Sequence, residues 1–282
     1  MSTAIFTDSI YADELLSITL RFGPHAPDNV LRVARVFMAM NRCTERLRTL
    51  YRNLRTSTPS AQPATFMWPH PTPDPPLPAE WIGELEFFSK VDRFLGTPIN
   101  QAVISEDNKR HATYLARMRT EDGPSTVMVK FSAKYNADAH NILAEHNPPL
   151  APTLHYCVPV IGDMYMVVME YIESAKSLRN ASLLLPIYAL EVVKRDVSEA
   201  LKLLHDQELV FGDIREQNVL YLPDGGGRAL LVDFDGVGRD GEDRYSACLN
   251  PDAGLYVSRL QIMEKSHDEE NLERLLSRLS ES

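Results

Sequence analysis

The spacing of apolar residues along the chain predicts long amphipathic helices and short strands. Apolar residues recur three or four positions apart, as in helices, in five segments: 11–20, 29–55, 136–146, 187–207 and 267–279. A sixth segment, 80–96, is also predicted to be an amphipathic helix or helix-turn. Apolar runs bounded by turn residues predict strands at 97–105, 111–119, 125–131, 150–156 and 164–169. Together these elements predict an α+β fold.

The clearest local prediction is a β-hairpin in the last third of the chain. Two apolar runs, 219–222 and 229–232, flank the turn sequence Pro-Asp-Gly-Gly-Gly at 223–227. Four polar side chains border these runs at one end of the hairpin: Asp213, Asn218, Asp233 and Asp235. Antiparallel pairing therefore gathers three carboxylates and one amide. Oxygen ligands of this kind suit Mg²⁺, which binds few protein carboxylates and completes its shell with phosphate and water.

Composition and charge narrow the classes of function. The 282-residue chain is 44% hydrophobic and 24% charged, which is enough apolar content for a buried core. Its formal net charge of −10 argues against a general nucleic-acid-binding protein, because no broad cationic surface can face a phosphate backbone. Three well-separated cysteines favour reduced thiols over disulfides or a zinc site. With no secretory signal and no apolar run of about 18 residues, we expect no membrane span and an intracellular protein, cytoplasmic or nuclear.

The first 79 residues differ in character from the rest. Residues 1–55 form a predicted helical extension, whose second helix carries a row of arginines: Arg42, Arg46, Arg48, Arg52 and Arg55. These arginines are either a solvated face or a docking surface for a protein partner or an anionic surface. Residues 56–79 contain eight prolines, which exclude a helix interior or a central strand. We interpret them as a linker or as a strap laid over a surface, with a ligand for a proline-recognising partner as the alternative.

Lys130 lies inside the predicted strand 125–131, among apolar residues. A lysine is costly to bury unless an acid pairs with it. In a strand, Lys130 shares a face with Met128, whereas Val129 and Phe131 face the other side. Lys130 is therefore either a functional cation that faces a site or an edge-strand lysine that points to water.

The order of these motifs resembles the protein kinase superfamily. The kinase catalytic loop has the pattern H-R-D-L-x-x-x-N, and segment 211–218 reads Phe-Gly-Asp-Ile-Arg-Glu-Gln-Asn, with the first two positions changed. The D-F-G element stands as Asp233-Phe234-Asp235, and the strand around Lys130 resembles V-A-I-K. The chain is further similar to compact, divergent kinase-like domains of fungi and to the kinase-type domains of crinkler effectors. The resemblance implies a two-lobed kinase-like fold, with an N-lobe at 80–173 and a reduced C-lobe at 174–282.

The resemblance implies catalytic and metal-binding roles for five residues. Asp213 accepts or orients the proton of a hydroxyl substrate, and Arg215 takes the position of a phosphate-contacting lysine. Asn218 and Asp233 hold Mg²⁺, with Asp235 as an additional carboxylate. An acid at position 235, where the family has glycine, resembles the small-molecule kinases of the superfamily.

The resemblance also implies how ATP is bound. Lys130 contacts the α- and β-phosphates and pairs with an acid of helix 136–146, either Asp138, which we favour, or Glu145. The connection between the lobes then places the backbone of Glu170, Tyr171 and Ile172 against adenine.

Three features depart from the family pattern. No G-x-G-x-x-G loop precedes Lys130, Phe211 replaces the histidine of the catalytic loop, and only 46 residues, without an A-P-E motif, follow Gly236. We predict an ATP- and Mg²⁺-dependent phosphotransferase, Ser/Thr protein kinase-like, that modifies a hydroxyl of a protein. The alternatives are a small-molecule kinase of the same superfamily, a pseudokinase that acts as an interaction module, and an unrelated α+β binding protein.

Overall fold

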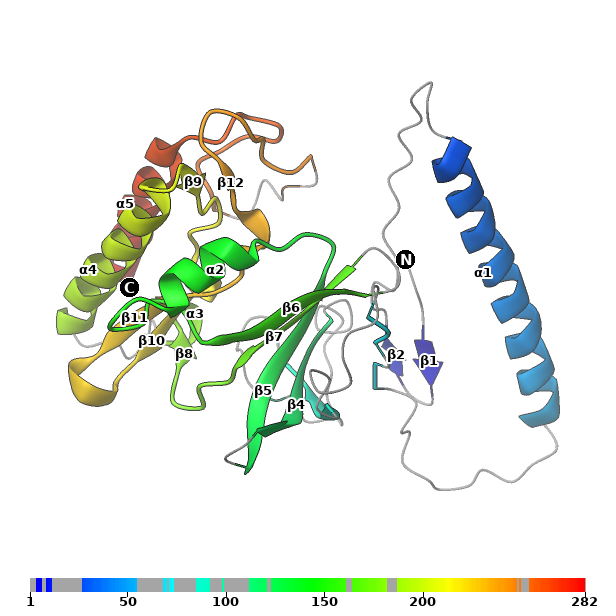
Figure 1. Cartoon of the computed structure of the whole chain (residues 1–282). Coiled ribbons are helices and arrows are strands. Elements are labelled where there is room, and N and C mark those ends of the chain that lie inside the picture. Colours follow the sequence, from blue (N-terminus) through cyan, green and yellow to red (C-terminus); the bar gives the residue numbers. More distant parts are fainter. Residues whose placement is uncertain are drawn as a thin grey trace.

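The chain is described by a computed structural model, in which a β-rich lobe and a helical lobe lie side by side (Figure 1). The residues that the structure describes are 4–6, 9–11, 27–54, 68–69, 71–73, 85–91, 98, 112–120, 123–160, 164–181, 187–247, 249 and 254–281. None of the helices in this part of the chain is long and apolar enough to cross a membrane.

The β-rich lobe is built on one five-stranded antiparallel sheet with the order β3-β4-β5-β7-β6. Its strands are β3 (Glu86–Lys90), β4 (Thr113–Thr120), β5 (Gly123–Ser132), β6 (Leu154–Val160) and β7 (Met164–Glu170). Alternate residues of β5, Val127 and Val129, are fully buried in a cluster with Val158 and Met166 on one face of the sheet. The period of two along β5 therefore turns Lys130 toward the opposite face.

Helix α2 (Ala137–Ala144) connects the sheet to the helical lobe, since it packs on both β6 and α4 (Figure 1). The side chain of Asn136 caps the helix by accepting a hydrogen bond from the N–H of Ala139 at 2.9 Å. Ala139, His140 and Leu143 are buried, so these positions of α2 face the core.

The helical lobe surrounds α4 (Ile187–His205), which packs against α5 (Lys265–Ser280) and β11. Among the described residues of this lobe, the other elements are β8 (Lys176–Ser177), α3 (Leu178–Ala181), β9 (Leu209–Val210), β10 (Val219–Leu222), β11 (Arg228–Leu231) and β12 (Gly238–Arg239). Short 3₁₀ turns lie at Glu216–Asn218, Asp224–Gly226 and Phe234–Gly236. The predicted helical period holds, because Val193, Val197 and Leu204 of α4 are all buried.

The predicted hairpin is confirmed. Strands β10 and β11 pair antiparallel, with Val219 opposite Leu231 and Leu222 opposite Arg228. The 3₁₀ turn at Asp224–Gly226 joins them. Gly227 has φ 85°, a left-handed backbone that glycine adopts without steric cost. This pairing brings the loops before β10 and after β11 to the same end of the hairpin.

The N-terminal region contains a small hairpin and a long helix. Strands β1 (Ala4–Phe6) and β2 (Ser9–Tyr11) pair with each other, and α1 (Pro27–Leu54) stands apart from the two lobes (Figure 1). Within the proline-rich segment, Pro73 is buried and forms a β-bridge with Val160 at the edge of the sheet. At that point the segment lies on the β-rich lobe, as expected for a strap.

Some predicted elements differ from the structure. The helix predicted at 80–96 is wrong, because Glu86–Lys90 forms the strand β3. Its apolar residues at 85, 87, 88 and 91 fit either period, and pairing with the open edge of β4 decides for the strand. The helix predicted at 11–20 begins on a residue of β2, and positions 12–20 lie outside the described residues. The strand predicted at 97–105 also lies outside the described residues, apart from Pro98.

One predicted strand is displaced along the sequence. The strand predicted at 150–156 is β6, which begins at Leu154. The residues before it are held by contacts outside the sheet: the N–H of Leu150 donates to the carbonyl of Leu143, and the carbonyl of Pro152 lies 2.8 Å from Nε2 of His140.

Candidate active site

The loop before β10 and the loop after β11 lie side by side, as the hairpin requires. Nδ2 of Asn218 donates to Oδ2 of Asp213 at 2.7 Å and to its carbonyl oxygen at 3.0 Å. The carbonyl of Asn218 accepts a hydrogen bond from the N–H of Val232, one residue before Asp233, at 3.0 Å. The predicted acids Asp213 and Asp233 and the amide of Asn218 therefore belong to one site.

Lys130 reaches this site from the β-rich lobe. Its Nζ atom lies 2.5 Å from Oδ1 of Asp233 and 2.6 Å from Oδ2 of Asp235. Ser132, two residues along β5, donates its hydroxyl to Oδ2 of Asp235 at 2.7 Å. Strand β5 thus presents a cation to both acids that follow β11 and a hydroxyl to the second of them, Asp235.

The charges of this cluster shift one another's ionisation. Burial by itself lowers the pKa of Lys130, but the two carboxylates raise it above its ordinary value. Burial acts to raise the pKa of Asp233, yet Lys130 and Arg215 hold it below the usual range. Burial together with the charge of Asp233 raises the pKa of Asp235 to about 6, against the effect of Lys130. At neutral pH the cluster therefore has one cation between two carboxylates.

The partner expected for Lys130 on helix α2 is not the one that it has. Asp138 and Glu145 are both exposed, and the lysine pairs with Asp233 and Asp235 instead. The cause is the orientation of α2, whose buried positions are Ala139, His140 and Leu143. Asp138 stands in the first turn of α2, where an acid is favourable for the helix dipole whatever it contacts.

Asp213 is held by Arg215 and Asn218. Nη2 of Arg215 donates to Oδ2 of Asp213 at 2.5 Å, and Nε lies 2.5 Å from Oδ1. Burial raises the pKa of Asp213 above its ordinary value, although Arg215 acts in the opposite direction. The guanidinium therefore fixes the orientation of a carboxylate that burial makes more basic.

Asp268 of α5 is a residue that the sequence reasoning missed. Its fully buried carboxylate accepts hydrogen bonds from the N–H groups of Phe211, at 2.7 Å, and Gly212, at 2.8 Å, directly before Asp213. Its Oδ2 also lies 3.1 Å from Nε2 of His205. A sequence signal was present, because Asp268 shares the four- and three-residue spacing of Leu272, Leu275 and Leu279 and is thus an acid on an apolar face.

Phe234 joins the site to α2 and to the loop at 211–218. Its ring stacks on that of His140 with centroids 4.5 Å apart, and the ring of Phe211 meets it edge-on at 5.5 Å. The carbonyl of Phe234 accepts a hydrogen bond from the N–H of Asn136 at 3.3 Å. All three rings are fully buried, so packing at position 211 takes the place of the polar histidine of the kinase pattern.

The residues predicted to contact adenine lie where the chain crosses between the lobes. Glu170 ends β7, and Tyr171 and Ile172 are half-buried in the connection to β8. The side chain of Glu170 accepts hydrogen bonds from both the N–H and the hydroxyl of Thr153, and its own N–H donates to the carbonyl of Thr153. Those groups of Glu170 are therefore engaged within the β-rich lobe.

The donor set at this site fits Mg²⁺. Oδ1 of Asp235 is buried and has no hydrogen-bond partner in the protein, so one carboxylate oxygen is open to a cation. No group of three His, Cys, Asp or Glu side chains among the described residues is arranged to hold a metal by itself. Two carboxylates, Asp233 and Asp235, with the amide of Asn218 match an ion that takes its other ligands from phosphate and water.

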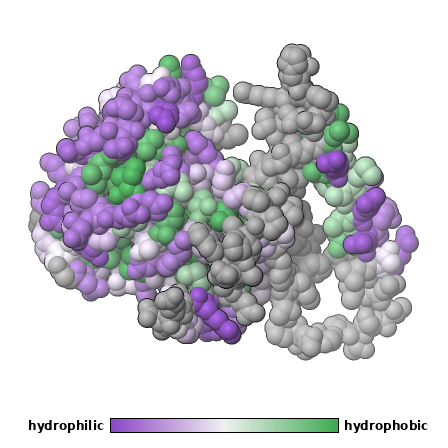
Figure 2. Space-filling model, in the orientation of Figure 1, coloured by the Kyte–Doolittle hydropathy of each residue, from purple (hydrophilic) through white to green (hydrophobic). Residues whose placement is uncertain are grey.

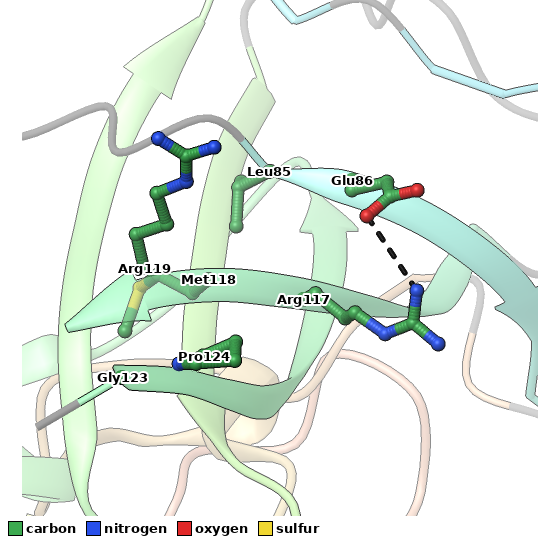
Figure 3. Close-up of a pocket in the computed structure, with 7 residues that line it drawn as sticks. All are labelled: Leu85, Glu86, Arg117, Met118, Arg119, Gly123 and Pro124. Carbon is green, nitrogen blue, oxygen red and sulfur yellow. Dashed lines mark ion pairs between the residues drawn. The ribbon is translucent and has the colours of Figure 1, made fainter.

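A separate depression, about 840 Å³ in volume, lies at the other end of the sheet (Figure 3). It is lined by Leu85, Glu86, Arg117, Met118, Arg119, Gly123 and Pro124. The strand register pairs Arg119 with Pro124 at the β4–β5 turn, whereas Lys130 pairs with Thr113. The depression is thus six residues along β5 from Lys130 and contains none of the site residues.

Comparison with known proteins identifies the fold. No protein-family model matches the sequence, and no curated protein gives a significant match. The structure is similar to that of the Cydia pomonella granulovirus kinase PK-1, with a TM-score of 0.50 and 18% identity, over 71% of this chain and 70% of that chain. The Rad53 kinase domain, in a complex with AMPPNP, overlaps less, with a TM-score of 0.35 and 19% identity over 45% and 48% of the two chains.

At this level of identity the likeness to PK-1 shows the fold alone. The chain therefore has a two-lobed, protein kinase-like α+β fold, as the sequence motifs predicted.

Proposed function

We propose that this protein is an ATP- and Mg²⁺-dependent phosphotransferase that transfers the γ-phosphate of ATP to a hydroxyl group. One observation carries the proposal: Lys130 of one lobe meets Asp233 and Asp235 of the other, beside the linked pair Asp213 and Asn218. Phosphoryl transfer requires mainly positioning and charge neutralisation, and this cluster supplies cationic, metal-binding and proton-accepting groups together.

Each group has a role that follows from its chemistry. Asp233, Asp235 and Asn218 would hold Mg²⁺, which when bound neutralises charge on the phosphates. Lys130 binds the α- and β-phosphates with an ammonium group that stays charged, since the neighbouring acids raise its pKa. Asp213 takes the proton of the acceptor hydroxyl at its carboxylate, and Arg215 keeps that carboxylate oriented.

The acceptor is proposed to be a Ser or Thr hydroxyl of a protein. A small-molecule acceptor is the second candidate, and the acid at position 235 favours it, because Asp235 adds a second carboxylate where the protein kinase pattern has glycine. A nucleotide-binding pseudokinase is the third candidate, favoured by the missing glycine-rich loop before Lys130. The resemblance to fungal and crinkler-type domains stays a prediction.

Nucleotide binding and transfer are tested with two variants of equal size. Mg-ATP should raise the melting temperature of the wild type, Asp233→Asn should abolish that shift, and Asp213→Asn should keep it. Labelled ATP should then give phosphate transfer by the wild type to a protein or small-molecule pool, and none by Asp213→Asn.

The outcomes separate the candidates. A shift with Mg-ATP but no transfer to any pool would identify a nucleotide-binding pseudokinase. The absence of a shift in the wild type at saturating Mg-ATP would contradict the proposal. Which pool is labelled distinguishes the protein acceptor from the small molecule.

A further inference from the structure

Helix α1 exposes large apolar side chains along its length. Among the residues whose side chains are described, Val30, Leu31, Phe37, Met38, Met40 and Leu47 are between 42% and 66% exposed. The helix forms no extended packing interface with any other described element, and Figure 2 shows apolar surface left open along it. Exposed apolar surface of this extent on a soluble chain is typical of an interaction site.

A free helix of this composition would be marginally stable. Most helical stability in proteins comes from packing of an apolar face, and an isolated helix is close to the coil equilibrium in water. Within the described part of α1 the stabilising side-chain contacts are local, for example the ion pair of Arg48 with Glu45 at 2.6 Å. Such contacts each contribute only about 0.2–0.5 kcal/mol. The helix therefore needs a surface that covers it.

Five apolar residues and one threonine of α1 follow a seven-residue repeat. Val30, Val33, Phe37, Met40, Thr44 and Leu47 are spaced alternately three and four residues apart, which is the pattern of the inner seam of a coiled coil. On a straight helix this seam drifts by about 20° per heptad. A second helix follows that drift by supercoiling, so the whole seam stays in contact with it. The spacing thus favours a helical partner over a lipid surface.

The residues that flank the seam allow an identical helix to be that partner. At the flanking positions stand Ala34, Val36, Asn41, Cys43 and Arg48, of which only the arginine is charged. Arg48 is already paired with Glu45 of its own helix. The other arginines of α1 whose side chains are described, at positions 35, 42, 46 and 52, fall on the outer side of the helix, away from the seam. Two copies can therefore pair without placing like charges against each other.

We propose that α1 is a dimerisation helix that pairs with α1 of a second copy through the seam Val30, Val33, Phe37, Met40, Thr44 and Leu47. The pairing joins two kinase-like bodies through their N-terminal regions. It is independent of catalysis, because no residue of α1 belongs to the site around Lys130.

Two neighbouring methionines provide a matched test. Met38 is 56% exposed and Met40 is 54% exposed, but only Met40 lies on the seam. The full chain, Met38→Glu, Met40→Glu and a second seam variant, Phe37→Glu, are compared by light scattering and sedimentation over a wide concentration range. Glutamate is a good helix former, so all three changes add the same charge without breaking the helix. Circular dichroism checks the helix content of each variant.

The wild type and Met38→Glu should have about twice the 31.8 kDa mass of the chain, and both seam variants should have the mass of one chain. The dissociation constant of Met40→Glu should exceed that of Met38→Glu by at least tenfold. A monomeric wild type would overturn the proposal, and binding of that monomer to anionic vesicles would point to a lipid surface instead. Equal disruption by Met38→Glu and Met40→Glu, or a dimer that survives both seam changes, would also overturn it.

Discussion

The Nζ atom of Lys130 lies 2.5 Å from Oδ1 of Asp233, although 103 positions separate the two residues in the sequence. The same ammonium group contacts Asp235, so one cation serves two carboxylates that would otherwise repel each other. The contact also joins strand β5 of the β-rich lobe to the loop after β11. It is therefore a structural link between the lobes as well as a part of the candidate site.

Replacing Lys130 by methionine should lower the free energy of unfolding by about 1–3 kcal/mol, measured by urea denaturation at neutral pH. The side chains are only partly buried, so the loss is smaller than for a fully buried pair, but two adjacent carboxylates remain without their cation. Adding Asp235→Asn to Lys130→Met should restore part of the loss, because it removes one of the repelling charges.

The matched control for that change is Lys134→Met. Lys134 donates its Nζ proton to the carbonyl of Val237 at 2.9 Å and forms no ion pair with an acid among the described residues. Lys134→Met should lower the free energy of unfolding by less than half as much as Lys130→Met. It should also leave the rise in melting temperature with Mg-ATP intact. An equal loss from both lysine variants would show that the carboxylates at 233 and 235 do not need the cation.

Removing the carboxylate of Asp268 should destabilise the loop before Asp213. Two buried N–H groups lose their acceptor in Asp268→Ala, at about 1–3 kcal/mol each, whereas Asp268→Asn keeps one acceptor oxygen and should cost less. If Asp213 is the catalytic base, phosphate transfer should fall more than nucleotide binding in both variants. Denaturation, thermal shift and transfer assays measure these three effects.

Asp196 of α4 provides the control for Asp268. Its buried carboxylate likewise accepts a backbone hydrogen bond, from the N–H of Ala229 at 2.8 Å, but it holds β11 rather than the loop before Asp213. Asp196→Asn should reduce stability without a selective loss of transfer. For each variant, the loss of phosphate transfer is compared with the loss in free energy of unfolding. If the two losses stand in the same ratio in Asp268→Asn and Asp196→Asn, Asp268 acts on stability only.

Gly212→Ala should be among the most damaging small substitutions in the chain. Gly212 has φ 76°, and an added Cβ would lie 2.6 Å from Cε of Met263 and 2.9 Å from the carbonyl oxygen of Gly236. Gly241 has a similar φ of 69°, yet its Cβ would meet nothing within 4 Å. Gly241→Ala should therefore lower the free energy of unfolding by about 1–2 kcal/mol, which is the cost of the left-handed backbone alone. Gly212→Ala should lower it further, because the added Cβ also overlaps Met263 and Gly236. Similar melting temperatures for the two variants would contradict the close approach of Gly236.

Acid should destabilise the fold through His140. Burial lowers the pKa of His140 to about 4, from about 6.5 in the unfolded chain, although the carbonyl of Pro152 opposes the shift. Between these values the unfolded chain binds a proton that the folded chain does not, so the free energy of unfolding falls as pH decreases from about 6.5 to 4. The contribution of this residue is at most about 3 kcal/mol.

Urea denaturation over that pH range measures the effect. His140→Gln should be less stable at pH 7, because it loses the stack on Phe234, but it should lose less stability on acidification. An unchanged slope in His140→Gln would assign the acid sensitivity to other groups.

Local pattern was sufficient to predict much of the site. The turn at 223–227 and the apolar runs beside it fix an antiparallel pair, and that pair brings Asp213 and Asn218 to the same end as Asp233. The period of two along β5 likewise places the side chains of Lys130 and Val129 on opposite faces of the sheet. These relationships depend on backbone geometry over a few residues, so they can be inferred without knowledge of distant packing.

Contacts between distant segments could not be inferred in the same way. Which acid meets Lys130 depends on how α2 packs, and burial of Ala139, His140 and Leu143 turns Asp138 to solvent. The support of the Asp213 loop by Asp268 of α5 arises only when α5 lies beside α4. Segment 86–90 fits both a helix and a strand, and the open edge of β4 selects the strand.

The sequence by itself therefore determined the hairpin and the acids gathered beside it, because turn chemistry and side-chain period act locally, whereas the two-lobed α+β class was implied by the resemblance of its motifs to those of kinases. The tertiary structure alone decided the partners of Lys130, the anchoring by Asp268 and the exposure of α1. Those depend on which surfaces the lobes bury against each other, and a linear pattern of apolar and polar residues does not contain that choice.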